Sequence, residues 1–214
     1  MKAKSQKAIF IFAALLAFAA LTFAQGTPNG KKALLAYFTY SENIDTAGMS
    51  LDAITSASYK TTNRQGNIQT MVQSVQAKRN VDTVSIRAAD RYDSVYSKMV
   101  VRARKERADN ARPAIDAQSR VANLAQYDVI YLGMPVWNGG IPKPVMTWLD
   151  QHDLSGKAVV VFNLHLGSRE GEILRELRQK YPTATIADNF TISASASNAD
   201  TKRQFDAFLD KLKI

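Results

Sequence analysis

Residues 33–38 read ALLAYF, a run of apolar and aromatic side chains with no polar interruption. Such a run is typical of a strand that is buried on both faces of a parallel sheet. Residues 129–132 (VIYL) and 158–162 (AVVVF) match it, while residues 81–86 and 183–192 are weaker candidates with partial alternation. These five segments are the predicted strands of one sheet.

Segments with the period of amphipathic helices separate these strands. The clearest apolar stripes begin at Ile68 and, near the C-terminus, at Phe205. We expect Asp200 to cap the last helix, and Pro142 and Pro144 to lie in the first turn of a short helix after the third strand. Strands that alternate with helices predict an α/β fold, a doubly wound parallel sheet with helices on both faces.

Residues 92–110 are also predicted to form a helix. We expect its apolar side chains to face the sheet; these are Val95, Met99, Val100 and Ala103. We expect its basic side chains to form a solvated outer face rather than a binding site; these are Lys98, Arg102, Arg104, Lys105 and Arg107.

The first 24 residues have the organisation of a secretory signal peptide. Three lysines within the first seven residues precede an apolar run from Ala8 to Phe23, and small residues precede Gln25. A membrane anchor is the alternative, but a membrane-spanning helix needs roughly 20 apolar residues, and residues 25–32 are polar and turn-rich. We therefore expect cleavage after Ala24, a mature domain of residues 25–214, and an exported protein that is periplasmic or secreted.

The composition excludes several kinds of chemistry. The chain has no cysteine, so neither a disulfide nor a thiol nucleophile is possible. Leu166 stands where the Gly-x-Ser-x-Gly motif of a serine hydrolase would need its first glycine before Ser168. His152 and His165 lack the spacing of metal ligands, so we expect no metal site, and we expect His152 to be a surface loop residue.

The mature domain is basic. The whole chain has 28 Lys and Arg against 19 Asp and Glu, and cleavage after Ala24 would remove three lysines and no acidic residue. This balance favours an acidic partner or an anionic envelope surface, although a soluble surface with spare lysines explains it equally well. The basic residues are scattered among acidic ones, so nucleic acid is not an expected partner.

Polar, glycine-bearing loops follow three of the predicted strands. They are residues 39–43 with 66–68 after the first strand, 134–140 after the third and 163–171 after the fourth. In open α/β sheets the ligand site lies beyond the carboxyl ends of the strands, so these loops should converge. Gly66 and Asn67 begin a helix whose free N–H groups favour an anion such as phosphate, although ordinary capping explains them as well. Residues 40–65 form an unusually long connection, which is typical of a functional loop or of minor structure.

Several of these stretches together resemble the flavodoxins. They are YFTYSEN at residues 37–43, Gly66-Asn67, NARP at residues 110–113, YDVIYLGMPVW at residues 127–137 and the segment 153–171. The resemblance extends from about residue 32 to residue 192 and is greatest with members that carry an insertion in the phosphate loop, which would explain residues 40–65. It implies a five-stranded parallel sheet of order 2-1-3-4-5, for which flavodoxin is itself a standard example, with FMN at the switch point between strands 1 and 3.

The same resemblance implies which residues bind FMN. Thr39, Ser41 and Asn67 would contact its phosphate, with Tyr40, Gly66 and Ile68 beside them. Pro135, Val136, Trp137, Asn138 and Gly139 would pass beside the flavin ring, while His165, Gly167 and Ser168 would line its other edge. Trp137 would stack on or near the ring, although a tryptophan at a strand end is also a candidate core residue. The family usually has threonine in place of Ile68 and an aromatic residue or glycine in place of Asn138.

Three functions are compatible with the sequence. The first is an exported, FMN-binding electron-transfer protein, whose partner would be a redox protein with an acidic surface or a small-molecule electron acceptor. The second is an FMN-dependent NAD(P)H:quinone-type oxidoreductase, and the third is a flavin-free binding module that kept the fold. For the two FMN-binding functions, we expect a backbone carbonyl near Asn138 or Gly139 to accept a hydrogen bond from N5 of the reduced flavin. We also expect the positive charge of the domain to raise the redox potential of the flavin.

Overall fold

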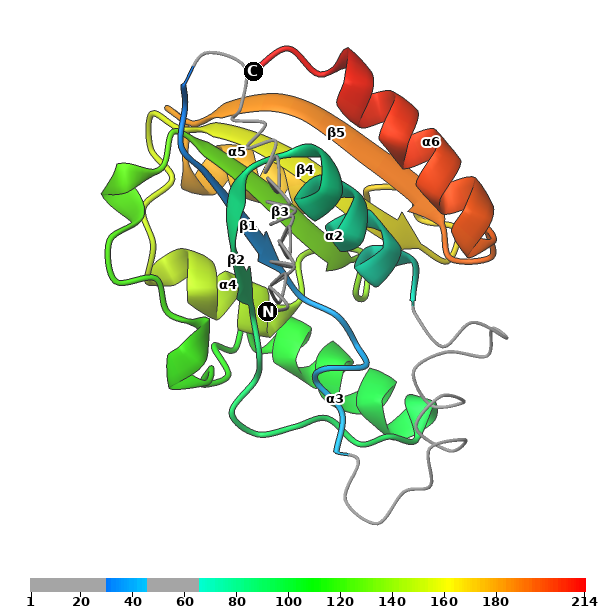
Figure 1. Cartoon of the computed structure of the whole chain (residues 1–214). Helices are drawn as coiled ribbons and strands as arrows, with labels where there is room; N and C mark the ends of the chain where they lie inside the picture. The colour runs from blue at the N-terminus through cyan, green and yellow to red at the C-terminus, as the bar shows by residue number, and fades with distance from the viewer. Residues whose placement is uncertain (1–29, 46–65) are drawn as a thin grey trace, which may run out of the picture.

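The computed structural model describes residues 30–45 and 66–214 (Figure 1). The predicted signal peptide, residues 1–24, and residues 46–65 of the predicted insertion lie outside this part of the chain. None of the helices described has the length and the apolar character needed to span a membrane.

A five-stranded, fully parallel sheet forms the centre of the domain. Its strands are β1 (Ala33–Tyr37), β2 (Val81–Ser85), β3 (Val129–Pro135), β4 (Ala158–His165) and β5 (Thr185–Ser193). Their spatial order is β2-β1-β3-β4-β5. Every residue of β1 and β3 is buried, as their uninterrupted apolar runs predict.

Helices cover both faces of the sheet, as Figure 1 shows. They are α2 (Asn67–Lys78), α3 (Tyr96–Ala108), α4 (Lys143–Asp150), α5 (Ile173–Lys180) and α6 (Asn198–Lys211), with short 3-10 helices η1 (Ala117–Ser119) and η2 (Leu124–Gln126). One core cluster joins the sheet to α2 and α6, and a second joins it to α3, α4 and α5. The predicted doubly wound sheet of order 2-1-3-4-5 is therefore confirmed.

Strands β3 and β4 both run three residues beyond their predicted ends, Leu132 and Phe162. The extensions pair with each other at Met134 with Asn163 and at Pro135 with Leu164, while Gly133 pairs with Phe162. Gly133 is required there because a Cβ atom would lie 2.3 Å from the ring of Phe162. Glycine and proline weaken a strand pattern in a sequence, yet both fit where a backbone is closely packed and the strand is about to end. The extra length brings Pro135 and His165 to the carboxyl edge of the sheet.

Helix α3 begins at Tyr96, four residues later than predicted. Tyr92 instead lies in the preceding loop, fully buried, and its hydroxyl donates to Glu106 Oε2 at 2.6 Å. Val95 takes the N-cap position and is 49% exposed, so the expectation that it faces the sheet is wrong. The apolar periodicity of the sequence cannot show that Tyr92 precedes the helix. Tyr92 is buried in the loop, and an apolar residue on the inner face of the helix would be buried as well.

Three expectations about caps and polar residues need correction. Ser197, not Asp200, is the N-cap of α6: its Oγ accepts the Asp200 N–H at 3.1 Å, while Asp200 lies in the first turn, where a negative charge favours the helix dipole. Pro144 lies in the first turn of α4 as predicted, whereas Pro142 is its N-cap. His152 is buried rather than in a surface loop, and its Nε2 accepts the N–H of Val121 at 3.0 Å.

Candidate functional site

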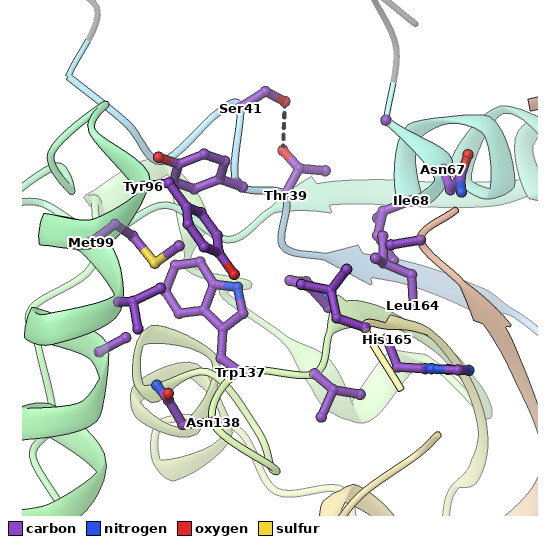
Figure 2. Close-up of a pocket in the computed structure, with 18 of the residues that line it drawn as sticks. Thr39, Ser41, Asn67, Ile68, Tyr96, Met99, Trp137, Asn138, Leu164 and His165 are labelled. Atoms are coloured by element: carbon purple, nitrogen blue, oxygen red, sulfur yellow. Dashed lines mark hydrogen bonds between the residues drawn. The ribbon is translucent and has the colours of Figure 1, made fainter. Parts of the chain in front are cut away.

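The loops after β1, β3 and β4 and the start of α2 enclose a cavity of about 220 Å³ at the carboxyl edge of the sheet (Figure 2). Eleven of the fourteen predicted cofactor-binding residues line it: Thr39, Tyr40, Ser41, Gly66, Asn67, Ile68, Pro135, Val136, Trp137, Asn138 and His165. Gly139, Gly167 and Ser168 do not line it. Nine further lining residues were not predicted: Gln69, Tyr96, Met99, Val100, Ala103, Arg104, Leu164, Leu166 and Ala194.

The start of helix α2 forms one end of this cavity. Gly66 is the N-cap, in an extended conformation, and as a glycine it has no side chain to cap the helix. The first N–H groups of a helix have no partner within it. Within residues 30–45 and 66–214 no acceptor contacts those of Asn67, Ile68 and Gln69, so they can serve a ligand. The side chain of Ile68 is buried in the core, so this residue offers an anion only its backbone N–H.

The side chain of Asn67 has partners other than the predicted phosphate. Its amide nitrogen donates to the carbonyl of Ala196 at 3.1 Å and to that of Ser193 at 3.5 Å. These two bonds use both hydrogens of the amide. The side chain therefore fixes the start of α2 against the connection between β5 and α6, and the backbone N–H of Asn67 is the group left for an anion.

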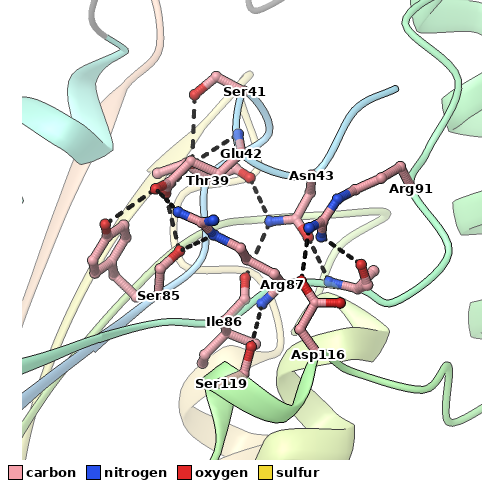
Figure 3. Close-up of polar contacts among 12 residues, drawn as sticks. Thr39, Ser41, Glu42, Asn43, Ser85, Ile86, Arg87, Arg91, Asp116 and Ser119 are labelled. Atoms are coloured by element: carbon pink, nitrogen blue, oxygen red, sulfur yellow. Dashed lines mark hydrogen bonds and ion pairs between the residues drawn. The ribbon is translucent and has the colours of Figure 1, made fainter. Parts of the chain in front are cut away.

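The hydroxyls of Thr39 and Ser41 form a hydrogen-bonded chain that ends on a carboxylate (Figure 3). Ser41 Oγ donates to Thr39 Oγ1 at 3.4 Å, and Thr39 Oγ1 donates to Glu42 Oε2 at 2.8 Å. A hydroxyl carries a single proton. Thr39 must therefore turn its proton away from Glu42 before it can donate to a bound anion.

Sequence reasoning gave no role to Glu42, which does not line the cavity but accepts a hydrogen bond from the lining residue Thr39. Its carboxylate also accepts hydrogen bonds from Ser85 Oγ at 3.2 Å and Tyr37 Oη at 3.3 Å, and it forms an ion pair with Arg87 at 3.1 Å. Burial, followed by the charge of Glu42, raises the pKa of Tyr37, so the phenol keeps its proton and remains a donor. The sequence carried no signal for this cluster, because Ser85 and Arg87 are 43 and 45 residues away from Glu42.

Asn43 holds the loop after β1 to the loop after β2 (Figure 3). The residue is fully buried. Its Nδ2 donates to the carbonyls of Thr39 at 2.8 Å and Ile86 at 3.1 Å, and its Oδ1 accepts the N–H of Ala88 at 2.7 Å. Every hydrogen-bonding group of the amide is therefore used, and the loop that carries Thr39 has a fixed position.

A tight turn follows β3. Trp137 and Gly140 exchange two backbone hydrogen bonds of 3.0 Å, and Asn138 (φ 47°) and Gly139 (φ 85°) between them have left-handed backbone. This is the two-residue turn of type I′, for which Asn-Gly is the preferred pair. Asn138 and Gly139 thus satisfy the geometry of the turn. The carbonyl of Gly139 already accepts the N–H of Glu172 at 2.7 Å, so the carbonyl of Asn138 is the remaining candidate acceptor for reduced N5.

Trp137 both lines the cavity and packs against core residues. Its ring is partly buried and meets the rings of Phe38 and Tyr92 edge to face, with centroids 5.0 and 4.9 Å apart. Tyr40 lies beside it, at 6.3 Å between centroids, and donates to the carbonyl of Asp93 at 3.2 Å. Burial, followed by the charge of Asp93, raises the pKa of Tyr40 to about 12. This wall is aromatic and uncharged, which suits a planar ligand.

The loop after β4 lies across the cavity from Trp137 (Figure 2). His165 is partly buried, and its Nδ1 accepts the N–H of Gly167 at 2.9 Å, so a neutral ring carries its proton on Nε2. Leu166, the next residue, is 65% exposed at the rim. The bond to His165 ties Gly167 into a local turn, and the cavity does not reach Gly167 or Ser168.

Helix α3 supplies a wall of the cavity that was not predicted. Its lining residues are Tyr96, Met99, Val100, Ala103 and Arg104. Figure 2 shows Met99 on the same side as Trp137, with Ile68, Leu164 and His165 opposite. Arg104 is exposed, as predicted for a solvated face, but it also lines the cavity. The expected solvated face is wrong for Arg102 and Arg107, which are partly buried and form ion pairs. The spacing of Tyr96, Val100 and Arg104 by four residues was the available signal for a common face.

Comparison with known proteins agrees with this geometry. Residues 32–208 match the family model for flavodoxin. A proposed flavoprotein from Bacteroides eggerthii has 24% identity and a TM-score of 0.59, with 86% of this chain and 99% of that chain covered. A flavoprotein from Lactobacillus acidophilus, solved in complex with FMN, has 16% identity and a TM-score of 0.53, with 85% and 98% covered. No curated protein sequence matches the chain.

At these identities the solved structures show a common fold. The family match covers well over half of the sequence and includes all three loops at the cavity. The sheet order is the one that the resemblance to the flavodoxins implied. The chain therefore belongs to the flavodoxin family.

Proposed function

We propose that this protein binds FMN in the cavity and transfers electrons through it. The observation that carries the proposal is that free helix N–H groups and an aromatic wall meet in one cavity, at the switch point between β1 and β3. FMN joins a phosphate to a planar ring system, and the two parts of the cavity suit these two groups. The family assignment and the FMN complex of the Lactobacillus acidophilus protein support the proposal.

Residues of this chain would hold FMN at both ends. The N–H groups at the start of α2 and the hydroxyls of Thr39 and Ser41 would bind the phosphate. Trp137 would flank the ring, and the backbone carbonyl of Asn138 would accept a hydrogen bond from it. Bound FMN supplies the redox chemistry, while these residues bind the cofactor, orient it and exclude water from one side of its ring.

One observation favours a second function, an FMN-dependent reductase of small acceptors with NAD(P)H as donor. The cavity extends beyond the predicted FMN contacts to five residues of α3. Transfer to a protein through an exposed ring edge needs no such compartment, whereas a small acceptor needs a concave site. Steady-state oxidation of NAD(P)H with a quinone acceptor tests this: turnover supports the reductase, and its absence in a protein that binds FMN supports the carrier.

We also propose that the protein is exported and that a protein partner would have an acidic surface. The three lysines, the apolar run and the polar segment after Ala24 support export, and the basic mature domain supports the partner's charge. N-terminal sequencing of the mature protein is expected to give Gln25 as the first residue. A chain that keeps Met1 and stays inside the producing cell would contradict the proposal.

Titration with FMN and with riboflavin tests the cofactor. We expect FMN to bind in a 1:1 ratio with quenching of its fluorescence, and to bind about tenfold or more tightly than riboflavin, because only FMN reaches the start of α2 with a phosphate. Equal affinities would contradict the placement of the phosphate. No binding at high FMN concentration would overturn the proposal and favour the flavin-free binding module.

A further inference from the structure

Three residues of α3 form a stripe along the cavity. Tyr96, Val100 and Arg104 are spaced by four, so they share one helix face. The Cα atoms of Tyr96 and Arg104 are roughly 12 Å apart along the helix axis, at 1.5 Å per residue. Met99 and Ala103, both buried, complete the wall beside the stripe. The wall is therefore aromatic at one end, apolar in the middle and cationic at the other end.

Arg104 differs from the other basic residues of α3. Each of the others forms an ion pair: Lys98 with Asp93, Arg102 with Asp90 and Glu106, Lys105 with Asp109, and Arg107 with Glu176. The side chain of Arg104 forms no hydrogen bond or ion pair with any residue in the ranges 30–45 and 66–214. Within those ranges, this guanidinium at the cavity wall has no neutralising side chain and keeps its donors for a ligand.

We propose that this stripe is the subsite for the electron acceptor, and that the acceptor is a planar aromatic molecule with an anionic substituent such as a carboxylate or sulfonate. The aromatic ring would pack against Tyr96 and Met99, on the side of the cavity where Trp137 lies. Arg104 would bind the anionic group through its fork of N–H donors. A neutral analogue gains only the apolar contacts, so the charge of the acceptor determines specificity.

This inference rests on the proposed function in its reductase form. A quinone acceptor would take up two electrons and two protons, so that both of its carbonyl oxygens become hydroxyls. Reduced FMN would lose the same two electrons and two protons and return to its oxidised form. The anionic substituent takes no part in this exchange, and acceptor binding can therefore be measured apart from turnover.

Two matched probes test the inference: anthraquinone-2-carboxylate and its neutral carboxamide, titrated by calorimetry into the FMN-loaded protein. Arg104→Gln is expected to weaken carboxylate binding about tenfold and carboxamide binding less than about twofold. Lys105→Gln is the control, because it removes the same charge from an adjacent residue that does not line the cavity. Equal losses for both probes, equal effects of both substitutions, or no binding of either probe to the unmodified protein would overturn the proposal.

The affinity for FMN separates failure of this inference from failure of the proposed function. Arg104→Gln is expected to leave FMN binding unchanged, as measured by flavin fluorescence. If the unmodified protein does not bind FMN, the proposed function fails, and the same probes titrated into the flavin-free chain still decide whether Arg104 binds the anion. If the substitution weakens FMN binding, Arg104 belongs to the cofactor site and the acceptor subsite is overturned.

Discussion

The two ends of the cavity are built in different ways. At the end formed by the loop after β1, polar side chains are fixed by hydrogen bonds: Asn43 is fully buried, and Glu42 accepts from four neighbouring side chains. At the end formed by α3, Tyr96 is 50% exposed, and Arg104 is exposed with no polar partner among the described residues. The first end suits a cofactor of constant structure. The second can adapt to ligands that differ from one another.

Asn43→Ala tests the rigidity of the first end and has the largest expected effect. The substitution leaves two carbonyls and one N–H buried without their partners. We expect the free energy of unfolding, measured with urea, to fall by about 3 kcal/mol. Asn123→Ala is the control, since Asn123 is exposed and its side chain caps nothing; we expect a change below about 0.5 kcal/mol. Similar losses for both variants would show that the loop does not depend on Asn43.

Gly139→Ala tests whether the turn after β3 is as rigid as the loop after β1, which forms the first end of the cavity. A side chain at φ 85° is strained, and we expect the free energy of unfolding to fall by about 1–2 kcal/mol. Asn138→Gly keeps the same backbone conformation accessible, so its stability is expected to stay within about 0.5 kcal/mol of the original. If the alanine variant is as stable as the glycine variant, the turn is free to change its conformation.

Glu42→Gln sharpens the comparison by removing the negative charge at the first end while keeping the shape of the side chain, although the amide nitrogen cannot accept the two hydrogen bonds of the oxygen that it replaces. The carboxylate lies next to the hydroxyls proposed for the phosphate, so its removal relieves repulsion of a bound dianion. We expect FMN to bind about threefold to tenfold more tightly, given partial screening by solvent. Riboflavin, which has no phosphate, is the matched ligand and is expected to show no change. An equal gain in affinity for riboflavin would show that the substitution does not act through the phosphate.

Tyr40→Phe has the smallest expected effect, on the pH dependence of stability. Burial and the charge of Asp93 raise the pKa of Tyr40 in the folded protein from 10.0 to about 12. Its contribution to stability is therefore fully present below pH 10 and is lost as the pH rises from 10 to about 12. In the variant, the free energy of unfolding is expected to fall less steeply over that interval. An unchanged slope would show that Tyr40 is not protected from ionisation.

The fold could be predicted because burial on both faces leaves a local mark in the sequence. The runs at residues 33–38 and 129–132 are uninterrupted because both faces of β1 and β3 are covered by helices. The ends of β3 and β4 were missed because Gly133 is explained by the ring of Phe162, which is distant in sequence. His152 was assigned to the surface for the same kind of reason, since its partner Val121 lies 31 residues away.

The candidate site was predictable in part. Residues at the carboxyl ends of strands follow from topology, which is why Thr39, Trp137 and His165 meet at one cavity. Glu42 and Arg104 were missed because their roles depend on how separate elements pack. Asn138 was read as a departure from the family pattern, whereas the turn after β3 explains it locally.

The hydrogen bond between Asn67 and Ala196 has a consequence for the order in which the protein is assembled. It joins two residues that are 129 positions apart, and α6, which packs beside α2, follows every other helix in the described ranges. A growing polypeptide therefore cannot complete the end of the cavity at the start of α2 until residue 196 has been made. Copies that stop before residue 196 would lack the contact that positions the start of α2, and we expect them to leave that end of the cavity incomplete.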